Sequence, residues 1–507
     1  MDKYLLGIDV GTGSTRCAIF DLSGNLLVDI GEREEYLTYR KFQSWAEQDP
    51  NDWWKAVRKG LNCLFDSNVV SPEEIAAIGV GGQTNGHVLV DSKGQSLGRA
   101  IIWQDRRAIK EATKVKEKLS SLDMAKYLGT YLPIDASTIP ARMLWLQRYE
   151  PEKIAKAVVM LQPKDFINYR LTDNFATDWA SCKTIIDLKQ NIFHNEYFSL
   201  LGLERRLIPE AFPPHGVIGT VTKNAAVETG LSTGTPVVAG SIDAWCNILG
   251  SGAVSPGISS DVSGSSEVIT VFSNSVEGTT LLNVIPSFDG YLINGPTQSG
   301  GDSLKWFKDN FAPPEELNAP EAYGYNWFDQ LAYNTIAGAG GLIFMPYLQG
   351  ERAPIWDSNA RGIFIGITKK HGYKEFVRSI LEGIAFSIRH VLETAEMVGK
   401  LKVQEIRVSG GGAKSAVWNQ IKADITGKVV RVPKVLNNAC LGVALIAGVG
   451  VGCYPSYAVA AQSAVQISME YKPNIKNQQR YQDLYKIYRQ LYPNLKELFY
   501  QLAEVSS

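Results

Sequence analysis

Glycine-rich turns that follow strand-like runs are the features of this 507-residue sequence with the most evident chemistry. In the opening segment, an apolar run ends at Asp9 and the turn Gly11-Thr12-Gly13-Ser14 follows. We predict two antiparallel strands joined by this turn. Glycine lets a backbone approach a ligand closely, and successive N–H groups in such a turn bind anions. Asp9 is placed to hold a hydrated cation beside that anion; the alternative is an ordinary glycine-rich hairpin.

Three further segments rich in glycine or serine occur in the second half of the chain. Gly264-Ser265-Ser266 precedes a strand-like run at 268–272, and a glycine-rich segment at 295–303 precedes a helix expected at 304–311. A strand expected at 406–409 runs into three consecutive glycines, Gly410 to Gly412. Bare backbone of this kind lets a flat ligand lie against it, although a tight strand-to-helix turn needs the same residues.

Polar side chains follow three further predicted strands. Asp243 comes after the strand expected at 236–242 and before a helical stretch, so it is either an N-cap or a catalytic carboxylate. Two amide- and carboxylate-rich clusters, 83–85 and 103–105, also follow apolar runs. Ligands of open α/β sheets bind outside such strand ends, but polar turn residues look the same in sequence.

The composition of the chain argues against several classes of protein. The net charge of −1 argues against nucleic acid or an anionic membrane as the main partner. The cysteines show no metal-type spacing and no C-x-x-C, so we expect reduced thiols in a cytoplasmic protein. Because a strand is predicted at the very start of the chain, we expect no signal peptide. The longest apolar run, 441–453, is too short to span a bilayer and is expected to be a buried helix.

Motif and length considerations suggest the organisation. No Walker loop occurs, and no G-x-G-x-x-G opens a helix, so a Rossmann dinucleotide site has no support. The length predicts at least two domains, and the segment 250–257 suggests a boundary between domains at 1–252 and 253–507. A phosphate-gripping hairpin with an Asp at the end of its first strand resembles that of the actin-like ATPases, which include actin, Hsp70 chaperones and sugar kinases.

Longer motifs resemble the FGGY family of carbohydrate kinases, most of all its xylulokinase branch. The opening 8–12 resembles the first phosphate loop of the family, and 346–354 with 360–362 is similar to its "PYLxGERxP…ARG" segment. The run 410–415, with Trp418, Gln420, Ala423, Asp424 and Gly427, matches the long and specific C-terminal signature. The resemblance covers nearly the whole chain.

This resemblance implies an α/β fold of two actin-like (RNase H-like) domains facing a central cleft, and ATP with Mg²⁺ as cofactors. It implies transfer of the γ-phosphoryl group to a sugar or polyol hydroxyl. Asp243 aligns with the general base and is a possible metal ligand, and Asp9 resembles the residue that positions Mg²⁺ through water. The nucleotide-contacting set implied is Gly11, Thr12, Gly13, Ser14, Arg16, Gly264, Ser265, Ser266, Gly300, Gly301, Gly411, Gly412 and Ala413.

The resemblance to xylulokinases is weaker at the residues expected to bind the substrate. Xylulokinases carry "GQMHG" where this chain has Gly82-Gln83-Thr84-Asn85-Gly86, and they tend to have Asn where Ala244 stands. The Arg-Glu pair of glycerol kinases is absent, which makes glycerol less favoured. Gln83, Thr84, Asn85, Trp103, Asp105 and Asp243 are the expected substrate residues.

These residues suit a polyol, and a ketopentose such as xylulose, another ketose or a sugar alcohol all stay open. A homodimer also stays open. The rival interpretations are an actin-like ATPase coupled to a protein partner and a regulator that has lost catalysis. The presence of both Asp9 and Asp243 argues against the second.

Overall fold

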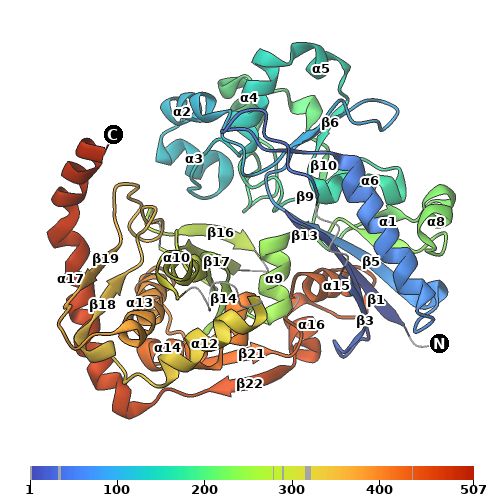
Figure 1. The fold of residues 1–507 in the computed structure, drawn as a ribbon. Coiled ribbons are helices and arrows are strands. Elements are labelled where there is room, and N and C mark those ends of the chain that lie inside the picture. The colour runs from blue at the N-terminus through green and yellow to red at the C-terminus, as the bar shows by residue number, and fades with distance from the viewer. Residues whose placement is uncertain are drawn as a thin grey trace. The chain divides into compact units, whose positions relative to one another are not determined.

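The chain folds into two compact units, each built on a seven-stranded sheet (Figure 1). The computed structural model describes residues 3–31, 36–277, 279–287, 290–313, 321–436 and 438–506. Unit 1 comprises Met1–Val254, Pro286–Phe288 and Asn437–Gln466, and unit 2 comprises Ser255–Ile285, Asp289–Leu436 and Ile467–Ser507. The chain thus leaves unit 1 near the expected boundary but returns to it for 437–466, which the sequence analysis placed in the second domain. The predicted domains and the cleft between them stay predictions.

The sheet of unit 1 has the strand order β11-β12-β5-β1-β2-β3, with β13 also paired to β5. The predicted opening hairpin is confirmed, because β1 and β2 are antiparallel neighbours. In contrast, β1, β12 and β13 all run parallel to β5, so their carboxyl ends meet at one edge. These strands are β1 (Tyr4–Val10), β2 (Thr15–Phe20), β3 (Leu26–Gly31), β5 (Ile75–Gly82), β11 (Val217–Thr220), β12 (Pro236–Val238) and β13 (Ser241–Ile242).

Three two-stranded sheets and a set of helices complete unit 1. The small sheets pair β4 (Glu47–Gln48) with β7 (Ala100–Ile101), β6 (Val88–Val90) with β8 (Val159–Leu161), and β9 (Ala176–Asp178) with β10 (Glu210–Phe212). The helices are α1 (Pro50–Asp66), α2 (Ile109–Lys118), α3 (Ser121–Leu128), α4 (Ile139–Tyr149), α5 (Pro151–Lys156), α6 (Pro163–Thr172), α7 (Asn195–Leu201), α8 (Lys223–Thr229), α9 (Asp243–Ser251), α15 (Asn438–Gly450) and α16 (Tyr457–Ala464).

Helix α15 is the apolar run that the sequence predicted to be a buried helix, and the structure confirms it. It touches β1, β5 and α9 backbone to backbone at glycines. A Cβ at Gly7 or Gly79 would overlap a carbonyl oxygen of α15, and one at Gly442 would overlap the Cys246 carbonyl oxygen of α9. Gly250 of α9 is equally close to the Asn438 carbonyl. Because no side chain fits at these points, the glycines set the distance of both helices from the sheet.

Unit 2 repeats the plan with the strand order β16-β17-β15-β14-β20-β21-β22. The predicted second hairpin is confirmed, since β14 and β15 are antiparallel. Its elements are β14 (Ile258–Ser263), β15 (Glu267–Ser273), β16 (Asn283–Ser287), β17 (Gly290–Pro296), β18 (Ile343–Met345), β19 (Ile363–Ile365), β20 (Glu405–Ser409), β21 (Val429–Pro433), β22 (Ile467–Tyr471), α10 (Gly301–Phe311), α12 (Glu321–Tyr333), α13 (Tyr373–Gly399), α14 (Ala416–Thr426) and α17 (Ile475–Ser506).

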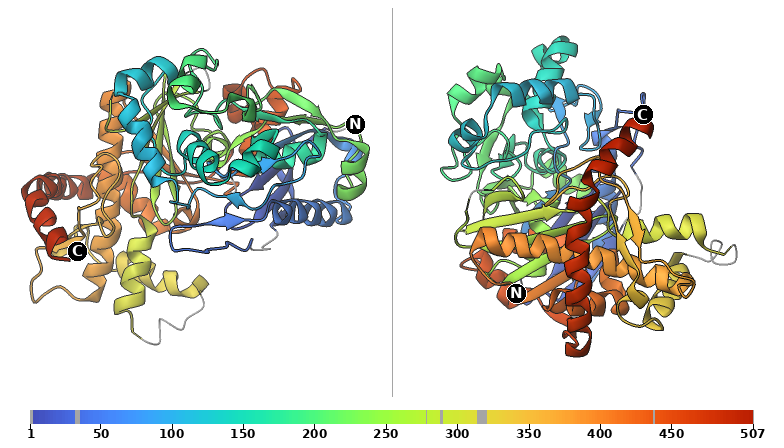
Figure 2. Two further views of the ribbon diagram at one scale, coloured as in Figure 1. Left: turned by 90° about the horizontal axis from the view of Figure 1, so that it is seen from above. Right: turned by 90° about the vertical axis from the view of Figure 1, so that its left-hand side faces the viewer.

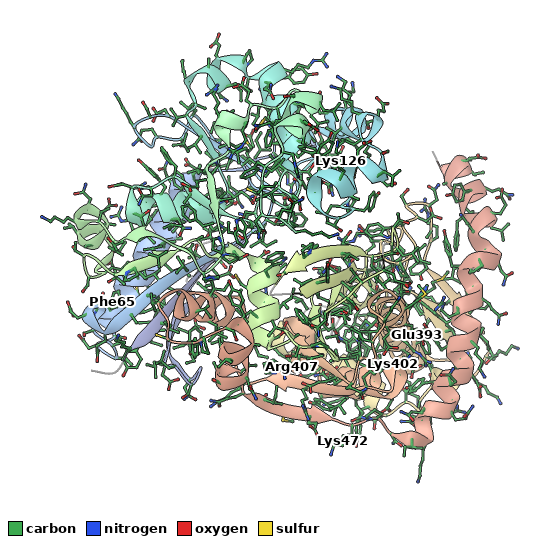
Figure 3. All side chains as sticks on the ribbon, turned by 180° about the vertical axis from the view of Figure 1, so that it is seen from behind. Phe65, Lys126, Glu393, Lys402, Arg407 and Lys472 are labelled. Atoms are coloured by element: carbon green, nitrogen blue, oxygen red, sulfur yellow. The ribbon has the colours of Figure 1, made fainter. Side chains whose placement is uncertain are left out.

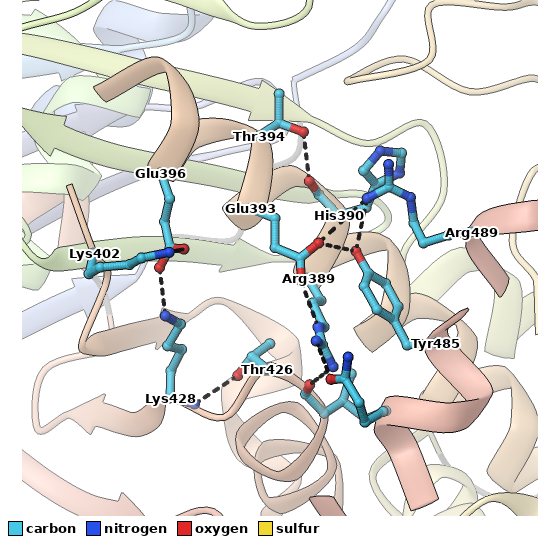
Figure 4. A network of polar contacts seen from close by, with 12 residues as sticks. Arg389, His390, Glu393, Thr394, Glu396, Lys402, Thr426, Lys428, Tyr485 and Arg489 are labelled. Carbon is cyan, nitrogen blue, oxygen red and sulfur yellow. Dashed lines mark hydrogen bonds and ion pairs between the residues drawn. The ribbon is translucent and has the colours of Figure 1, made fainter. Parts of the chain in front are cut away.

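Polar contacts join the long helices of unit 2. The Tyr485 hydroxyl of α17, the long red helix of Figure 2, donates to Glu393 of α13 at 2.8 Å. Nearby, Glu396 accepts hydrogen bonds from Lys402 (3.1 Å) and Lys428 (2.6 Å), as Figure 4 shows. In the part of the chain that the structure describes, no helix is long and apolar enough to cross a membrane.

The glycine contact between α15 and α9 generates a stability prediction. We expect Gly442→Ala to lower the free energy of unfolding by about 1–3 kcal/mol or more, because the added methyl group must displace the backbone of α9. The measurement is the midpoint of denaturant unfolding. Gly372→Ala in unit 2 is the matched control, since its Cβ would meet only the end of the Glu375 side chain at 3.5 Å. An unchanged midpoint for Gly442→Ala would show that the contact is not tight.

Candidate functional site

Two predicted carboxylates come together at one edge of the unit 1 sheet. Asp9 is the penultimate residue of β1 and lies opposite Gly81 of β5. Strand β13 pairs with the same end of β5 through Ser241 and Ile242, so Asp243 follows directly beside it. Asp9 and Asp243 are therefore neighbours although 234 residues separate them in sequence, which is the difference between their numbers. Parallel pairing to one central strand is what places them together.

The surroundings of both carboxylates disfavour their ionised form and so raise their pKa values. Burial, together with the negative charge of Asp243, raises the pKa of Asp9 to about 7, although Arg16 lowers it. Burial raises the pKa of Asp243 to about 6, against the opposing effects of the Ala244 N–H and the Lys183 ammonium group. Asp9 Oδ1 is out of contact with solvent and has no hydrogen-bond partner among the described residues. A buried, unpaired carboxylate oxygen of this kind suits a cation or an ordered water.

Asp243 is not the helix N-cap that the alternative interpretation required. The N-cap of α9 is Ile242, and Asp243 is the first helical residue. Its Oδ1 accepts a hydrogen bond of 2.6 Å from the Ala244 N–H, and the side chain stays partly exposed. The structure therefore leaves this carboxylate able to meet a ligand.

The first glycine turn is held by side chains from the predicted substrate clusters. The Gly11 N–H donates to the Ser14 carbonyl at 3.1 Å, and Gly13 has open space where a Cβ would lie. The Trp103 indole donates to Thr12 Oγ1 at 2.9 Å, while Gln83 is buried and bonds to Gln48 (3.0 Å). Trp103, 40% exposed, still presents a ring face, whereas Gln83 serves the turn.

Lys183 is a candidate functional residue that the sequence analysis missed. Its ammonium group donates to Thr84 Oγ1 at 3.1 Å. Burial lowers its pKa, opposed by three carboxylates of which Asp243 has the largest effect. It lies in the turn-rich stretch after β9, where no periodicity or motif distinguishes it. Asn85, which follows Thr84 in the sequence, has a left-handed φ of 55°, and its side-chain amide donates a hydrogen bond of 3.1 Å to Ser137.

Asp105 occupies a different position from the other predicted substrate residues. Its side chain is fully buried, and its oxygens accept hydrogen bonds from the Arg107 guanidinium (2.8–3.0 Å) and from the Ala46 N–H (2.6 Å). A carboxylate engaged in this way holds the loop that carries Trp103 rather than offering a free oxygen to a substrate.

A buried ion cluster fixes the segments that carry Lys183 and Asp243. Lys164 bonds to Asp165, to Asp178 (2.9 Å) and to the Ala239 carbonyl (3.2 Å), and all three side chains are buried. Asp178 also accepts a hydrogen bond from Ser241 Oγ at 3.0 Å. Removing one member would leave an uncompensated buried charge, so the cluster is a rigid support behind the site.

Unit 2 brings its three predicted glycine segments together. The Gly300 N–H donates to the Ser265 carbonyl (2.7 Å) and the Gly301 N–H to the Gly264 carbonyl (2.9 Å). Gly410 has a left-handed φ of 76°, and a Cβ there would lie 2.6 Å from the Ser263 carbonyl oxygen, on the strand that leads to Gly264. In the described structure Gly411 has open space at the Cβ position. The second turn (264–266), 300–301 and 411–413 thus form one glycine-lined surface.

A second ion cluster lies beneath this surface. The Lys422 ammonium group of α14 is fully buried and bonds to Asp261 (2.6 Å), Ser263 (3.0 Å) and Glu267 (3.1 Å). The hairpin that carries the second turn is therefore anchored at both strands. Neither Lys422 nor its partners stood out in the sequence as more than ordinary strand and helix residues.

The raised pKa values in unit 1 generate a prediction about pH. The native state holds protons on Asp9 that the unfolded state releases, so this carboxylate lowers stability as the pH rises through about 7. We expect Asp9→Asn, in metal-free buffer, to be more stable than the unsubstituted protein at about pH 8, by on the order of a few kcal/mol, with the difference shrinking toward pH 5. Thermal unfolding at both pH values measures it.

The control for this experiment is Asp309→Asn, which alters a half-exposed surface carboxylate paired with Lys305. It should show no such pH-dependent gain. A difference between Asp9→Asn and the unsubstituted protein that is the same at both pH values would contradict the raised pKa.

Comparison with known proteins fits this geometry. The models of the two domains of the FGGY family of carbohydrate kinases match this chain, the N-terminal domain at residues 4–250 and the C-terminal domain at residues 262–451. A xylulose kinase of Bacillus subtilis (strain 168) is 31% identical over 509 residues, which cover 98% of this chain and 98% of the relative.

Two solved structures are also similar along the whole chain. The gluconate kinase from Lactobacillus acidophilus superposes with a TM-score of 0.87 at 25% identity, covering 99% of this chain and 100% of the other. The xylulose kinase from Rhodospirillum rubrum does so with a TM-score of 0.87 at 27% identity, covering 98% and 100%. The predicted actin-like α/β class is thereby confirmed. The chain belongs to the FGGY family of carbohydrate kinases, phosphotransferases that take a phosphoryl group from ATP to an alcohol group of a small sugar.

Proposed function

We propose that this kinase phosphorylates a ketopentose, with xylulose as the first candidate, and that Asp243 is its general base. The proposal is carried by the position of Asp243, a partly exposed carboxylate beside Asp9 at the strand ends of unit 1. The xylulose kinase of Bacillus subtilis, which this chain resembles over nearly its full length, supports the choice of sugar.

Phosphoryl transfer from ATP has a loose transition state, so the protein contributes mainly positioning and charge stabilisation. In the proposed reaction the sugar hydroxyl gives its proton to an Asp243 oxygen and its oxygen bonds to the γ-phosphorus. The bond from that phosphorus to the β,γ-bridging oxygen breaks, and ADP leaves. The N–H groups at 12–14 suit the anionic oxygens, and the glycine-lined surface of unit 2 suits the nucleotide.

The donor groups of unit 1 fit a hydrated Mg²⁺. The described residues contain no group of three or more His, Cys, Asp or Glu side chains that could enclose a metal. Asp9 nevertheless offers a buried oxygen that has no partner in the described part of the chain, and Asp243 lies beside it. Mg²⁺ is commonly held through one or two carboxylates, several waters and substrate phosphates, which requires no more than this pair. When bound, Mg²⁺ would supply charge neutralisation at the phosphates.

The sugar end of the proposed site departs from the xylulokinase pattern at Thr84 and Asn85. Lys183 donates to Thr84, and its ammonium group has three N–H donors and no acceptor. Such a group favours a substrate oxygen that only accepts hydrogen bonds. The carbonyl of a ketose has that character, and so does the carboxylate of an aldonate, for which the gluconate kinase likeness is a second indication. An aldonate is therefore the second candidate.

The role of Asp243 is tested by Asp243→Asn. Asparagine keeps the size of the side chain but cannot accept the hydroxyl proton, and general-base catalysis is worth about 10²–10⁴-fold. We expect kcat for sugar phosphorylation to fall by about that factor, with the affinity for ATP nearly unchanged. Stopped assays of sugar phosphate formation and a nucleotide titration measure the two quantities. Asp309→Asn is the control, and near-normal kcat in Asp243→Asn would remove the assignment.

The role of Lys183 is tested by Lys183→Met over a panel of xylulose, gluconate and xylitol. Losing a charged hydrogen-bond donor costs about 1.5–3 kcal/mol, which corresponds to roughly 10–150-fold in kcat/KM. We expect that loss for the substrate whose carbonyl or carboxylate meets Lys183, and a smaller one for xylitol. Lys189→Met, at an exposed lysine in the same stretch, should leave all three values unchanged. Equal losses on every substrate would show that Lys183 does not select among them.

A further inference from the structure

A polar cavity in unit 1 is lined by none of the residues proposed for catalysis. It measures about 220 Å³ and lies between the small sheets and helices α4 and α5. Apolar residues form part of its wall, and its charged and polar lining consists of Glu47, His87, Arg99, Arg107, Glu150 and Lys153. A volume of this size holds several water molecules or one small metabolite.

His87 is the unusual member of this lining. Its side chain is 2% exposed, and neither ring nitrogen has a hydrogen-bond partner among the described residues. Its backbone is fixed, because the N–H and C=O groups both pair with Ile101 at 2.9 Å. Burial and the neighbouring Arg142 hold the pKa of His87 well below its ordinary value, so the imidazole is neutral, with one N–H donor and one acceptor. A buried donor without a partner calls for a ligand or water in the cavity.

A buried cation, Arg142, lies near His87, and Asp105 is the carboxylate with the largest effect on the pKa of Arg142. Arg142 is fully buried and, in the described structure, donates only to the carbonyls of Ile101 (2.7 Å), Ile102 (3.3 Å) and Ala136 (3.4 Å). Burial lowers its pKa to about 10, which leaves it charged at neutral pH.

The cations of the lining add to this charge. Arg99 lies over the ring of Tyr39 at 3.5 Å and has no carboxylate partner among the described residues. Among the described residues, Lys153 pairs only with Glu150, at 3.1 Å, and both side chains are partly exposed. Arg107 is occupied by Glu47 and Asp105. The cations therefore outnumber the carboxylates at this cavity.

We propose that the cavity binds a small metabolite through a phosphate or carboxylate group. The anion would accept a hydrogen bond from the His87 N–H and would balance the charges of the lining cations Arg99 and Lys153. The cavity also adjoins the two segments proposed to bind the sugar. His87 directly follows the segment 83–86, and Arg107 of the lining holds Asp105 of the loop that carries Trp103. A bound anion is therefore expected to change the KM for the sugar.

The experiment titrates the full-length protein by calorimetry at low salt with inorganic phosphate, with citrate and with neutral ribitol. The phosphate and citrate arms distinguish the two kinds of anion, and ribitol should not bind here. The paired substitution Arg99→Gln with Lys153→Gln should weaken anion binding by at least about ten-fold, since each removes a charged partner. His87→Leu is a second variant, which removes the N–H donor and should also weaken anion binding.

Two control substitutions lie outside the lining of this cavity. Lys126→Gln changes an exposed cation on α3, labelled in Figure 3, and should leave binding unchanged. Asp243→Asn should also retain binding at the cavity. In kinetic assays, phosphate or citrate should shift the sugar KM of the unsubstituted protein and not that of the Arg99/Lys153 variant. No anion binding at millimolar concentration, or binding that this variant leaves intact, would overturn the proposal and show that the cavity holds water only.

Discussion

The candidate site of unit 1 depends on the close approach of one buried helix to backbone. Helix α15 contacts β1, β5 and α9 at Gly7, Gly79 and Gly442, where a single methyl group would overlap a carbonyl oxygen. This contact seats α9 against the same strands whose ends carry Asp9, so the first residue of α9, Asp243, comes to the same edge. Protein interiors are packed too densely to absorb a shift there. The spacing of the two carboxylates follows from this packing.

Holding those carboxylates together is costly, and the surrounding structure supplies the rigidity to do it. Their raised pKa values show that burial outweighs the stabilising effects of Arg16 on Asp9, and of Lys183 and the Ala244 N–H on Asp243. The buried Lys164–Asp178 pair, with Ser241 bonded to it, prevents β13 and the turn before Lys183 from relaxing away. Sites that bind phosphate and a cation often keep such destabilised groups, because the ligand itself completes their pairing.

Unit 2 also uses a buried lysine to hold the segments of its candidate site in place. Its second turn is anchored from below by Lys422, which bridges Asp261 and Glu267 on the two strands of the hairpin. Gly300, Gly301, Gly410 and Gly412 then approach this hairpin so closely that side chains at these positions would collide with it. The result is an exposed backbone surface on a fixed base, which suits a large flat ligand without relying on side-chain recognition.

The sequence by itself determined the local features: the two hairpins with their glycine turns, the buried helix α15, and the family, through motifs long enough to be specific. It also singled out Asp9 and Asp243, because a carboxylate at a strand end is visible as a local pattern. Only the tertiary structure shows that α15 packs in unit 1, that Asp105 forms an ion pair with Arg107, and that Lys183 donates a hydrogen bond to Thr84. It alone revealed the cavity around His87. These facts depend on pairing and packing between segments distant in the chain, and no local spacing of residue types encodes which distant partner fills a given space.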